Sequence, residues 1–274
     1  MMTVGILVGL HKDMEAEFNK IKEYGFTSCQ ICSWNGDIMN EEYAQIVNDA
    51  KEKTGINVSS FWCGLPGPAA WNFTEGPVTI GFVPAEYRYV RVEAIKKGAN
   101  FAWMCGIPNV VTHAGFIPEN PCDQVYREVV ACMRPIIRHC KNIGVNFCFE
   151  TGQETPITLL RIIEDLGGEN IGVNLDTGNL ILYGKGSPSD AIDVIGPYVM
   201  DFHAKDGDYP ITGAFLGEEQ ALGKGKANFP EIIRKMKAIG YDGPITIERE
   251  IHGDQQTKDI LEAKRILEEL INAE

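Results

Sequence analysis

The feature that most constrains this chain is a regular alternation of β-rich runs with amphipathic helical stretches, repeated eight times. Such alternation favours parallel strands joined by crossover helices, and eight units in about 250 residues are typical of an α/β chain that closes into a (β/α)₈ TIM barrel. The predicted strands are 3–9, 27–33, 57–64, 109–115, 145–151, 171–179, 199–206 and 243–250. The predicted helices are 12–24, 41–55, 85–99, 121–143, 156–166, 188–196, 229–239 and 255–272.

A doubly wound open sheet is the competing fold. That fold often carries a G-x-G-x-x-G turn after its first strand, and "VGLHKDME" has none, although this excludes only some such folds. No linker, repeat or low-complexity run divides the sequence. We therefore expect one TIM-barrel domain over residues 1–274.

Composition limits the partners. The chain is 44% hydrophobic and 23% charged, as in ordinary globular proteins, and its formal net charge of −13 disfavours nucleic acid and anionic membranes. No run reaches the roughly 18 apolar residues of a spanning helix, and the start lacks signal-peptide features. We expect a cytoplasmic protein, and a homo-oligomer stays open.

The eight cysteines are scattered through strand-like and helix-like segments, which suits reduced thiols. Cys29 and Cys32 form a C-x-x-C pattern, but in a strand they point to opposite faces. We expect both to be small buried side chains, and neither a metal pair nor a redox disulfide.

Polar side chains gather where four consecutive strands end. Because side chains alternate along a strand, Glu150 shares its face with Asn146 and Cys148, while Phe147 and Phe149 face the helices. The same rule turns further side chains inward, namely Asn174, Asp176, Asp201, His203, Lys205, Thr246, Glu248 and Glu250, and His113 has matching parity on the fourth strand.

A barrel interior normally holds branched apolar residues, so these groups must be paired or bind a cation. Glu150, Asp176, His203 and Glu248 stand at the carboxyl ends of their strands, where barrel active sites are built. Three carboxylates and one imidazole favour one divalent ion. Mn²⁺ is preferred, with Mg²⁺, Co²⁺ or Zn²⁺ as alternatives.

Two long insertions follow strands. Residues 65–83 carry Trp71 and Phe73 among prolines and glycines, and either form a lid over a small polar ligand or plug the barrel rim. Residues 207–227 are a candidate second wall of the site.

At this point the sequence resembles a family. "FETGQE", "NLDTGN", "FHAKD" with a downstream "LGKGKANF", "ITIERE" and "VVTHAG" are similar to strand ends of the xylose-isomerase-like TIM barrels, the sugar phosphate isomerase/epimerase superfamily, over roughly residues 88–250. The resemblance implies that Glu150, Asp176, His203 and Glu248 bind one divalent cation, with Glu150 and Glu248 as the catalytic acid/base pair.

The superfamily also contains abasic-site DNA endonucleases with three zinc ions, and here several of their ligands are missing. Asn179 stands where that branch has histidine, "GEE" (217–219) replaces Asp-x-His, and the third strand ends in Cys63. Asn179 also departs from several ketose 3-epimerases, which carry a substrate-contacting histidine there. One metal ion is therefore expected.

The implied function is a sugar or sugar phosphate isomerase or epimerase that removes a proton next to a carbonyl through a metal-stabilised enediolate. A small carbohydrate is the expected partner. The alternative is a lyase or dehydratase acting by β-elimination on a keto-sugar, keto-inositol or keto-glycoside. A DNA endonuclease and a non-catalytic sugar-binding barrel are less favoured.

Substrate contacts are expected from His113, Asn179, Lys205, Trp71 and Phe73. His113 would otherwise pair with Glu150, and Lys205 would otherwise neutralise an inner carboxylate. Glu250 is expected in solvent. Surface positions are expected for His11, His139, His252, Arg88 and Arg91, and Lys185, Lys224 and Lys226 are the only candidate phosphate ligands.

Overall fold

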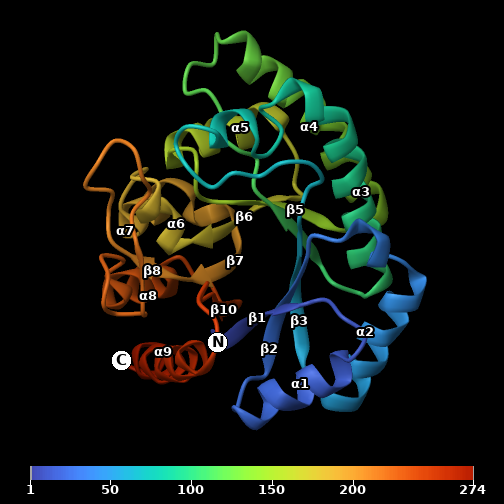
Figure 1. Cartoon of the computed structure of the whole chain (residues 1–274), viewed down its shortest axis with the longest axis vertical. Coiled ribbons are helices and arrows are strands. Elements are labelled where there is room, and N and C mark those ends of the chain that lie inside the picture. The colour runs from blue at the N-terminus through green and yellow to red at the C-terminus, as the bar shows by residue number, and fades with distance from the viewer. Residues whose placement is uncertain (1, 274) are drawn as a thin grey trace.

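A closed barrel of eight parallel strands organises the computed structural model, which describes residues 2–273 (Figure 1). The strand order around the barrel is β1-β10-β7-β6-β5-β4-β3-β2, so the first strand pairs with the last. The strands are β1 (Thr3–Gly9), β2 (Ser28–Ser33), β3 (Asn57–Cys63), β4 (Asn109–Thr112), β5 (Asn146–Glu150), β6 (Ile171–Asp176), β7 (Val199–Ala204) and β10 (Pro244–Ile247). The predicted fold class is confirmed.

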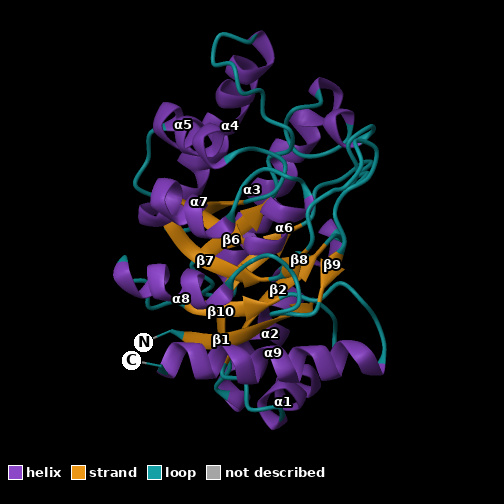
Figure 2. Ribbon diagram, turned by 90° about the vertical axis from the view of Figure 1, so that its left-hand side faces the viewer, coloured by secondary structure: helices purple, strands orange, loops and turns teal. Residues whose placement is uncertain are grey.

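Helices surround the strands, as Figures 1 and 2 show from two directions. They are α1 (Met14–Glu23), α2 (Glu41–Thr54), α3 (Arg88–Met104), α4 (Gln124–Ile143), α5 (Pro156–Leu166), α6 (Thr177–Leu182), α7 (Pro188–Ile195), α8 (Phe229–Ala238) and α9 (Asp254–Asn272). Helix α9 runs along β1, so the two ends of the described chain lie close together in both views.

Local sequence signals set the helix ends. The Asn40 side chain accepts the backbone N–H of Tyr43 and caps α2, which ends at Gly55 with φ 75°. Asp123 caps α4 in the same way, and Gly144 ends it, also with φ 75°. An oxygen-bearing cap at the start and a left-handed glycine at the end are common helix boundaries, and they fix the ends of two helices that were predicted from their amphipathic pattern.

The apolar core lies mainly between the strands and the surrounding helices. Phe147 and Phe149 of β5 belong to this outer layer, as their alternation with Glu150 predicted. Inside the barrel the apolar cluster is small, with Trp62, Val111 and Cys148 at its centre. Burial of apolar area therefore stabilises the helical shell more than the barrel interior.

Hydrogen-bonded polar groups fill much of the interior instead. The buried Asp201 carboxylate accepts the hydroxyl of Ser60, and Asn109 donates to the same hydroxyl at 3.2 Å. Asn146 in turn donates to Asn109 at 2.9 Å. A buried carboxylate is tolerated here because neighbours on other strands satisfy it.

Three predicted strands end three residues earlier than expected, and others end one or two residues earlier. The run 171–179 stops at Asp176 because α6 begins there, and the runs 109–115 and 243–250 stop at Thr112 and Ile247. His113 and Glu248 thus follow their strands directly. The strand ends still deliver these side chains to the same rim of the barrel.

Beyond β7 the chain forms a small hairpin of β8 (Asp206–Gly207) and β9 (Glu219–Gln220). The Asp206 carboxylate accepts backbone N–H groups of Gly223, Gly225 and Ala227 at 2.8–3.0 Å, so the glycine-rich loop folds around it. A Cβ on Gly225 would lie 2.3 Å from Asp206 Oδ1. In the motif "FHAKD…LGKGKANF", the Asp206 carboxylate therefore binds the backbone of the glycine-rich segment and holds it against the end of β7.

Arg91 overturns a sequence expectation, because it is buried at 1% exposure instead of facing water. Its guanidinium donates to the backbone carbonyls of Pro66, Pro68 and Gly81 at 2.7–3.0 Å. Periodicity alone misplaced it, since the long loop after β3 folds over the first turns of α3. Arg91 fastens that loop to the barrel.

No helix within residues 2–273 is long and apolar enough to cross a membrane. The eight cysteines carry no disulfide in the described chain. Cys29 packs in the outer core and Cys32 lines the barrel mouth, on opposite faces of β2 as expected.

Arg91→Met is expected to lower the free energy of unfolding by about 3 kcal/mol, because three loop carbonyls lose the buried guanidinium that donates to them. Urea denaturation followed by circular dichroism measures this change. Arg234→Met is the matched control, since Arg234 is exposed and bonds only to Glu231 on its own helix. If the two variants unfolded at the same urea concentration, the structural role of Arg91 would be contradicted.

Candidate metal centre and active site

The four strand-end residues meet at one point on the barrel rim. Glu150 ends β5, Asp176 ends β6, His203 lies near the end of β7, and Glu248 follows β10. One ligand atom from each lies within 4.8 Å of the others, and only Glu248 is more than marginally exposed. The four strands are neighbours in the barrel, so this meeting follows from closure of the sheet.

His203 lies at the centre of the cluster. Its Nδ1 is 3.0 Å from Glu150 Oε1 and 3.0 Å from Glu248 Oε2. The distance from Nδ1 to Asp176 Oδ2 is 3.6 Å. Three carboxylates therefore face a single imidazole nitrogen.

A chain of amides sets the orientation of His203. Gln30 donates through Nε2 to Asn174 Oδ1 at 2.9 Å, which leaves its Oε1 to accept from His203 Nε2, also at 2.9 Å. With Nε2 as the donor, the neutral imidazole turns the Nδ1 lone pair toward the carboxylates. Metal-binding histidines in proteins are commonly held in this way.

The charges of the cluster are strongly perturbed. Burial by itself lowers the pKa of His203, but the carboxylates of Glu248 and Glu150 outweigh it and raise that pKa well above its usual value. Burial raises the pKa of Asp176 well above its ordinary range. For Glu248, burial is outweighed by Lys205 and His203, so its pKa is well below the usual value.

The donor set fits a divalent cation. Asp176 Oδ2 is buried without a hydrogen-bond partner and faces the space between the other three side chains. Oxygen donors with one imidazole suit Mg²⁺, Mn²⁺ and related ions. A cation here would take the place of the proton that otherwise relieves the repulsion between the carboxylates.

Asp176 also begins α6. Its Oδ1 accepts the backbone N–H of Asn179 at 2.7 Å, so the residue is the N-cap of this helix. An Asp at a strand end is a strong helix-capping signal, and here it ends the β-rich run 171–179 at residue 176. One oxygen thus fixes the carboxylate while the other faces the cluster.

Glu150 is held by donors on its second oxygen. His113 Nε2 lies 3.2 Å from Glu150 Oε2, and the indole N–H of Trp62 donates to the same oxygen. Burial lowers the pKa of His113, which favours its neutral form. The pairing of His113 with Glu150 is one of the two roles that its position suggested.

Lys205 is buried against carboxylates. Its Nζ lies 2.9 Å from Glu250 Oε1 and 3.6 Å from Glu248 Oε2. Glu250 is 58% exposed, as a solvent position predicted, yet it also lines the cavity and binds Lys205. The expectation that it stands apart from the site is therefore wrong, because the strand ends at Ile247 and the chain turns across the mouth.

A cavity of about 300 Å³ opens above the cluster. His113, Asn179 and Trp71 line it, as does Leu216 of the second long loop, whereas Phe73 and Lys205 do not. Its remaining lining residues are Leu7, Cys32, Trp34, Trp62, Glu150, Leu182, Tyr183, Glu248 and Glu250. Such a volume suits a small ligand.

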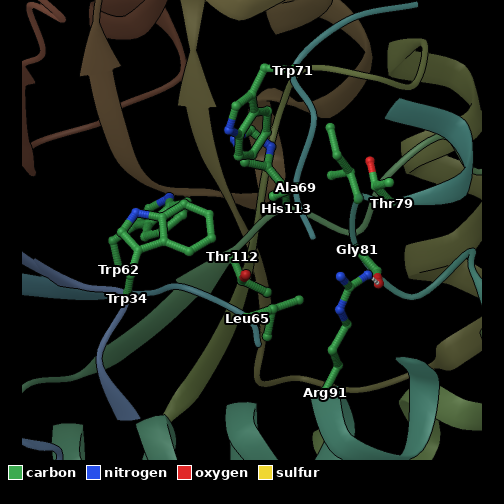
Figure 3. A pocket seen from close by; sticks show the side chains of 11 residues that line it. Trp34, Trp62, Leu65, Ala69, Trp71, Thr79, Gly81, Arg91, Thr112 and His113 are labelled. Atoms are coloured by element: carbon green, nitrogen blue, oxygen red, sulfur yellow. Dashed lines mark hydrogen bonds between the residues drawn. The ribbon is translucent and has the colours of Figure 1, made fainter. Parts of the chain in front are cut away.

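Three tryptophan rings line this cavity, and Figure 3 shows them from a small neighbouring void that they also border. The centre of the Trp34 ring lies 5.0 Å from that of Trp62 and 6.1 Å from that of Trp71. The ring centres of Trp71 and His113 are 5.1 Å apart. A Cβ on Gly64 would lie 2.5 Å from the Trp34 ring, so glycine there admits the ring. Trp71 lines the cavity, while Phe73 packs against Tyr183.

Sequence reasoning missed Trp34, Trp62 and Gln30. Gln30 could have been found, because an amide inside the apolar run "SCQICS" has inward parity. Trp62 likewise has inward parity on β3 and could have been found in the same way. Trp34 follows β2 in a loop, and only the fold brings it to the cavity.

Comparison with known proteins agrees with this architecture. A family model described as xylose isomerase-like TIM barrel matches residues 18–270. A xylose isomerase domain protein from Planctomyces limnophilus is 32% identical, with a TM-score of 0.91 over 98% of this chain and 97% of that chain. An uncharacterized protein of Methanocaldococcus jannaschii is 24% identical, covering 98% of this chain and 88% of that protein.

More distant solved structures share the fold. A D-tagatose 3-epimerase-like protein is 21% identical, with a TM-score of 0.75 and coverage of 98% and 97%. Lower identities relate the chain to a D-psicose 3-epimerase, a probable 3-DHS dehydratase from Bacillus anthracis, and a barrel from Mycobacterium smegmatis in complex with magnesium. From the family match and the 32% identical structure, the chain belongs to the xylose isomerase-like TIM barrel family.

Proposed function

We propose that this protein is a metal-dependent sugar isomerase or epimerase that removes a proton from a carbon next to a carbonyl. The observation that carries the proposal is the placement of Glu150 and Glu248. Both carboxylates line one cavity, both contact His203, and two intervening strands separate β5 from β10. Two carboxylates on different sides of one ligand suit proton removal and return.

The proposed roles follow from the contacts. Glu150, fixed by His113 and Trp62, and Glu248, fixed by Lys205, exchange the proton with the substrate carbon. In an epimerase one carboxylate removes it and the other returns it on the opposite face. Asn179 and His113 would orient the substrate hydroxyls, and Trp71 would exclude water.

Glu150, Asp176, His203 and Glu248 would hold the divalent cation, with Mn²⁺ preferred and Mg²⁺, Co²⁺ or Zn²⁺ as alternatives. When bound, the ion supplies Lewis-acid stabilisation of negative charge on the substrate oxygens. Support comes from the unpartnered Asp176 oxygen and from the related barrel solved with magnesium.

The second candidate is a lyase or dehydratase. The same base would remove the same kind of proton, and a leaving group on the next carbon would then depart. The structural neighbour named as a probable dehydratase supports keeping this alternative, whereas the neighbours named as 3-epimerases support the first. A small carbohydrate as partner, a cytoplasmic location and a homo-oligomer stay predictions.

The test is a screen of keto-sugars in D₂O with Mn²⁺, followed by NMR. Deuterium entering next to the carbonyl, with inversion or a shifted carbonyl, supports the epimerase or isomerase. Loss of a leaving group favours the lyase. Metal uptake without any exchange at carbon would instead favour a sugar-binding barrel, and DNA retention at physiological salt would favour a nuclease.

Glu150→Gln and Glu248→Gln are each expected to lower kcat by about 10²–10⁴-fold, because an amide cannot exchange the proton. Turnover of the sugar found in the screen is the measurement. Glu169→Gln is the control, since its side chain is 96% exposed. The assignment is wrong for either glutamate if its variant keeps turnover within about threefold of the unchanged protein.

Gln30→Leu is expected to weaken Mn²⁺ binding by about 10–100-fold, because His203 loses the acceptor that fixes its tautomer. Isothermal titration of chelator-treated protein with MnCl₂ measures the change. Gln45→Leu, an exposed position on α2, is the control. Unchanged affinity in Gln30→Leu would contradict the orienting role.

A further inference from the structure

The charged residues that line the cavity, histidine aside, are all acidic. Glu150, Glu248 and Glu250 line it, and neither lysine nor arginine is among the residues that surround it. If a divalent ion is held by the cluster, four carboxylates including Asp176 still face only that ion and Lys205. The lining therefore keeps an excess of negative charge even with metal bound.

Lys205 is the nearest cation, but it is already committed. It bonds to Glu250 and lies near Glu248, and its side chain is 2% exposed. Its stem also packs on α6, where a Cβ on Gly178 would lie 2.4 Å from Lys205 Cγ. This packing leaves the ammonium group little freedom to reach a ligand.

Other cations lie nearby but do not line the cavity, and one of them, Arg249, pairs with Glu219 at 3.0 Å and with Asp259 at 2.9 Å. Arg91 donates to three loop carbonyls and borders only a separate void of about 20 Å³, which has room for about one water molecule (Figure 3). Lys185 lies 5.9 Å from the centre of the Phe116 ring. None of these cations lines the cavity, so none could pair with a phosphate group bound there.

The rest of the lining suits neutral, hydroxyl-rich molecules. Trp34, Trp62 and Trp71 offer flat apolar surfaces to C–H groups. Tyr183 lines the cavity and has a buried hydroxyl without a hydrogen-bond partner, and Asn179 also lines the cavity. A phosphate dianion would meet carboxylates with no cation to pair with, which strongly disfavours its burial.

We propose that the cavity selects an uncharged keto-sugar and rejects its phosphorylated counterpart, with the Lys205–Glu250 pair as the element that withholds the nearest cation. This inference rests on the proposed function for its choice of keto-sugars. The binding of sugars is nevertheless measured separately from their conversion.

The experiment uses tryptophan fluorescence of the Mn²⁺-loaded protein carrying Trp103→Phe. Trp103 is an exposed residue of α3, and the other three of the four tryptophans line the cavity. The probes are matched pairs: D-fructose with D-fructose 6-phosphate, D-tagatose with D-tagatose 6-phosphate, and D-ribulose with D-ribulose 5-phosphate. In at least one pair the free sugar is expected to bind about 100-fold more tightly.

Equal or tighter binding of the phosphorylated member in every responding pair would overturn the inference, as would the lack of any response to all six sugars. Phosphorylated-sugar binding that Lys185→Ala abolishes would overturn it as well, by showing a cationic anchor. Deuterium exchange, recorded on the same samples, reports on the proposed function alone. Selective binding without exchange would thus contradict the proposed function and still support the proposed selectivity.

Glu250→Gln provides the second measurement. Because it frees Lys205 and removes one carboxylate, the preference for the free sugar is expected to fall by about tenfold. Glu218→Gln is the matched control, an exposed neighbour in the loop that does not line the cavity. An unchanged preference in Glu250→Gln would show that the pair does not set the selectivity.

Discussion

Repulsion between the buried carboxylates Glu150, Asp176 and Glu248 is the constraint around which the rest of the structure is arranged. Each is delivered by a different strand, and the β6–β7 register places Asp176 directly beside His203. Burial makes such a cluster costly unless positive charge is present. The imidazole, the buried lysine and the donors on Glu150 all compensate this negative charge.

The polar barrel interior supports that arrangement. Gln30 and Asn174 join opposite sides of the barrel under His203, and the Asp201–Ser60 pair lies in the strands next to them. These bonds contribute less net stability than apolar burial of the same volume would. Their effect is orientation, because each amide has few alternatives inside a closed sheet, and stability comes mainly from the outer layer of Phe147, Phe149 and their neighbours.

Much of this could be predicted from sequence, since alternation along parallel strands is a rigid rule. It placed Glu150, Asp176, His203 and Glu248 on one rim and the phenylalanines on the other face. It failed where loops fold back. Arg91 is buried because a distant loop covers it, Glu250 joins the site because the chain turns after β10, and Trp34 reaches the cavity from a loop. Contacts of this kind depend on tertiary structure, which no local pattern encodes.

The attachment of the Trp71 loop through Arg91 has a consequence for how such a barrel can diversify. The guanidinium binds carbonyl oxygens of the backbone, which every amino acid carries. Apart from tightly packed glycines such as Gly76 and Gly81, side chains along residues 65–82 can therefore be exchanged over evolutionary time while the path of the loop stays fixed. The residues of this loop that face the cavity can therefore change to suit new ligands, because Arg91 binds the backbone whatever side chain each position carries.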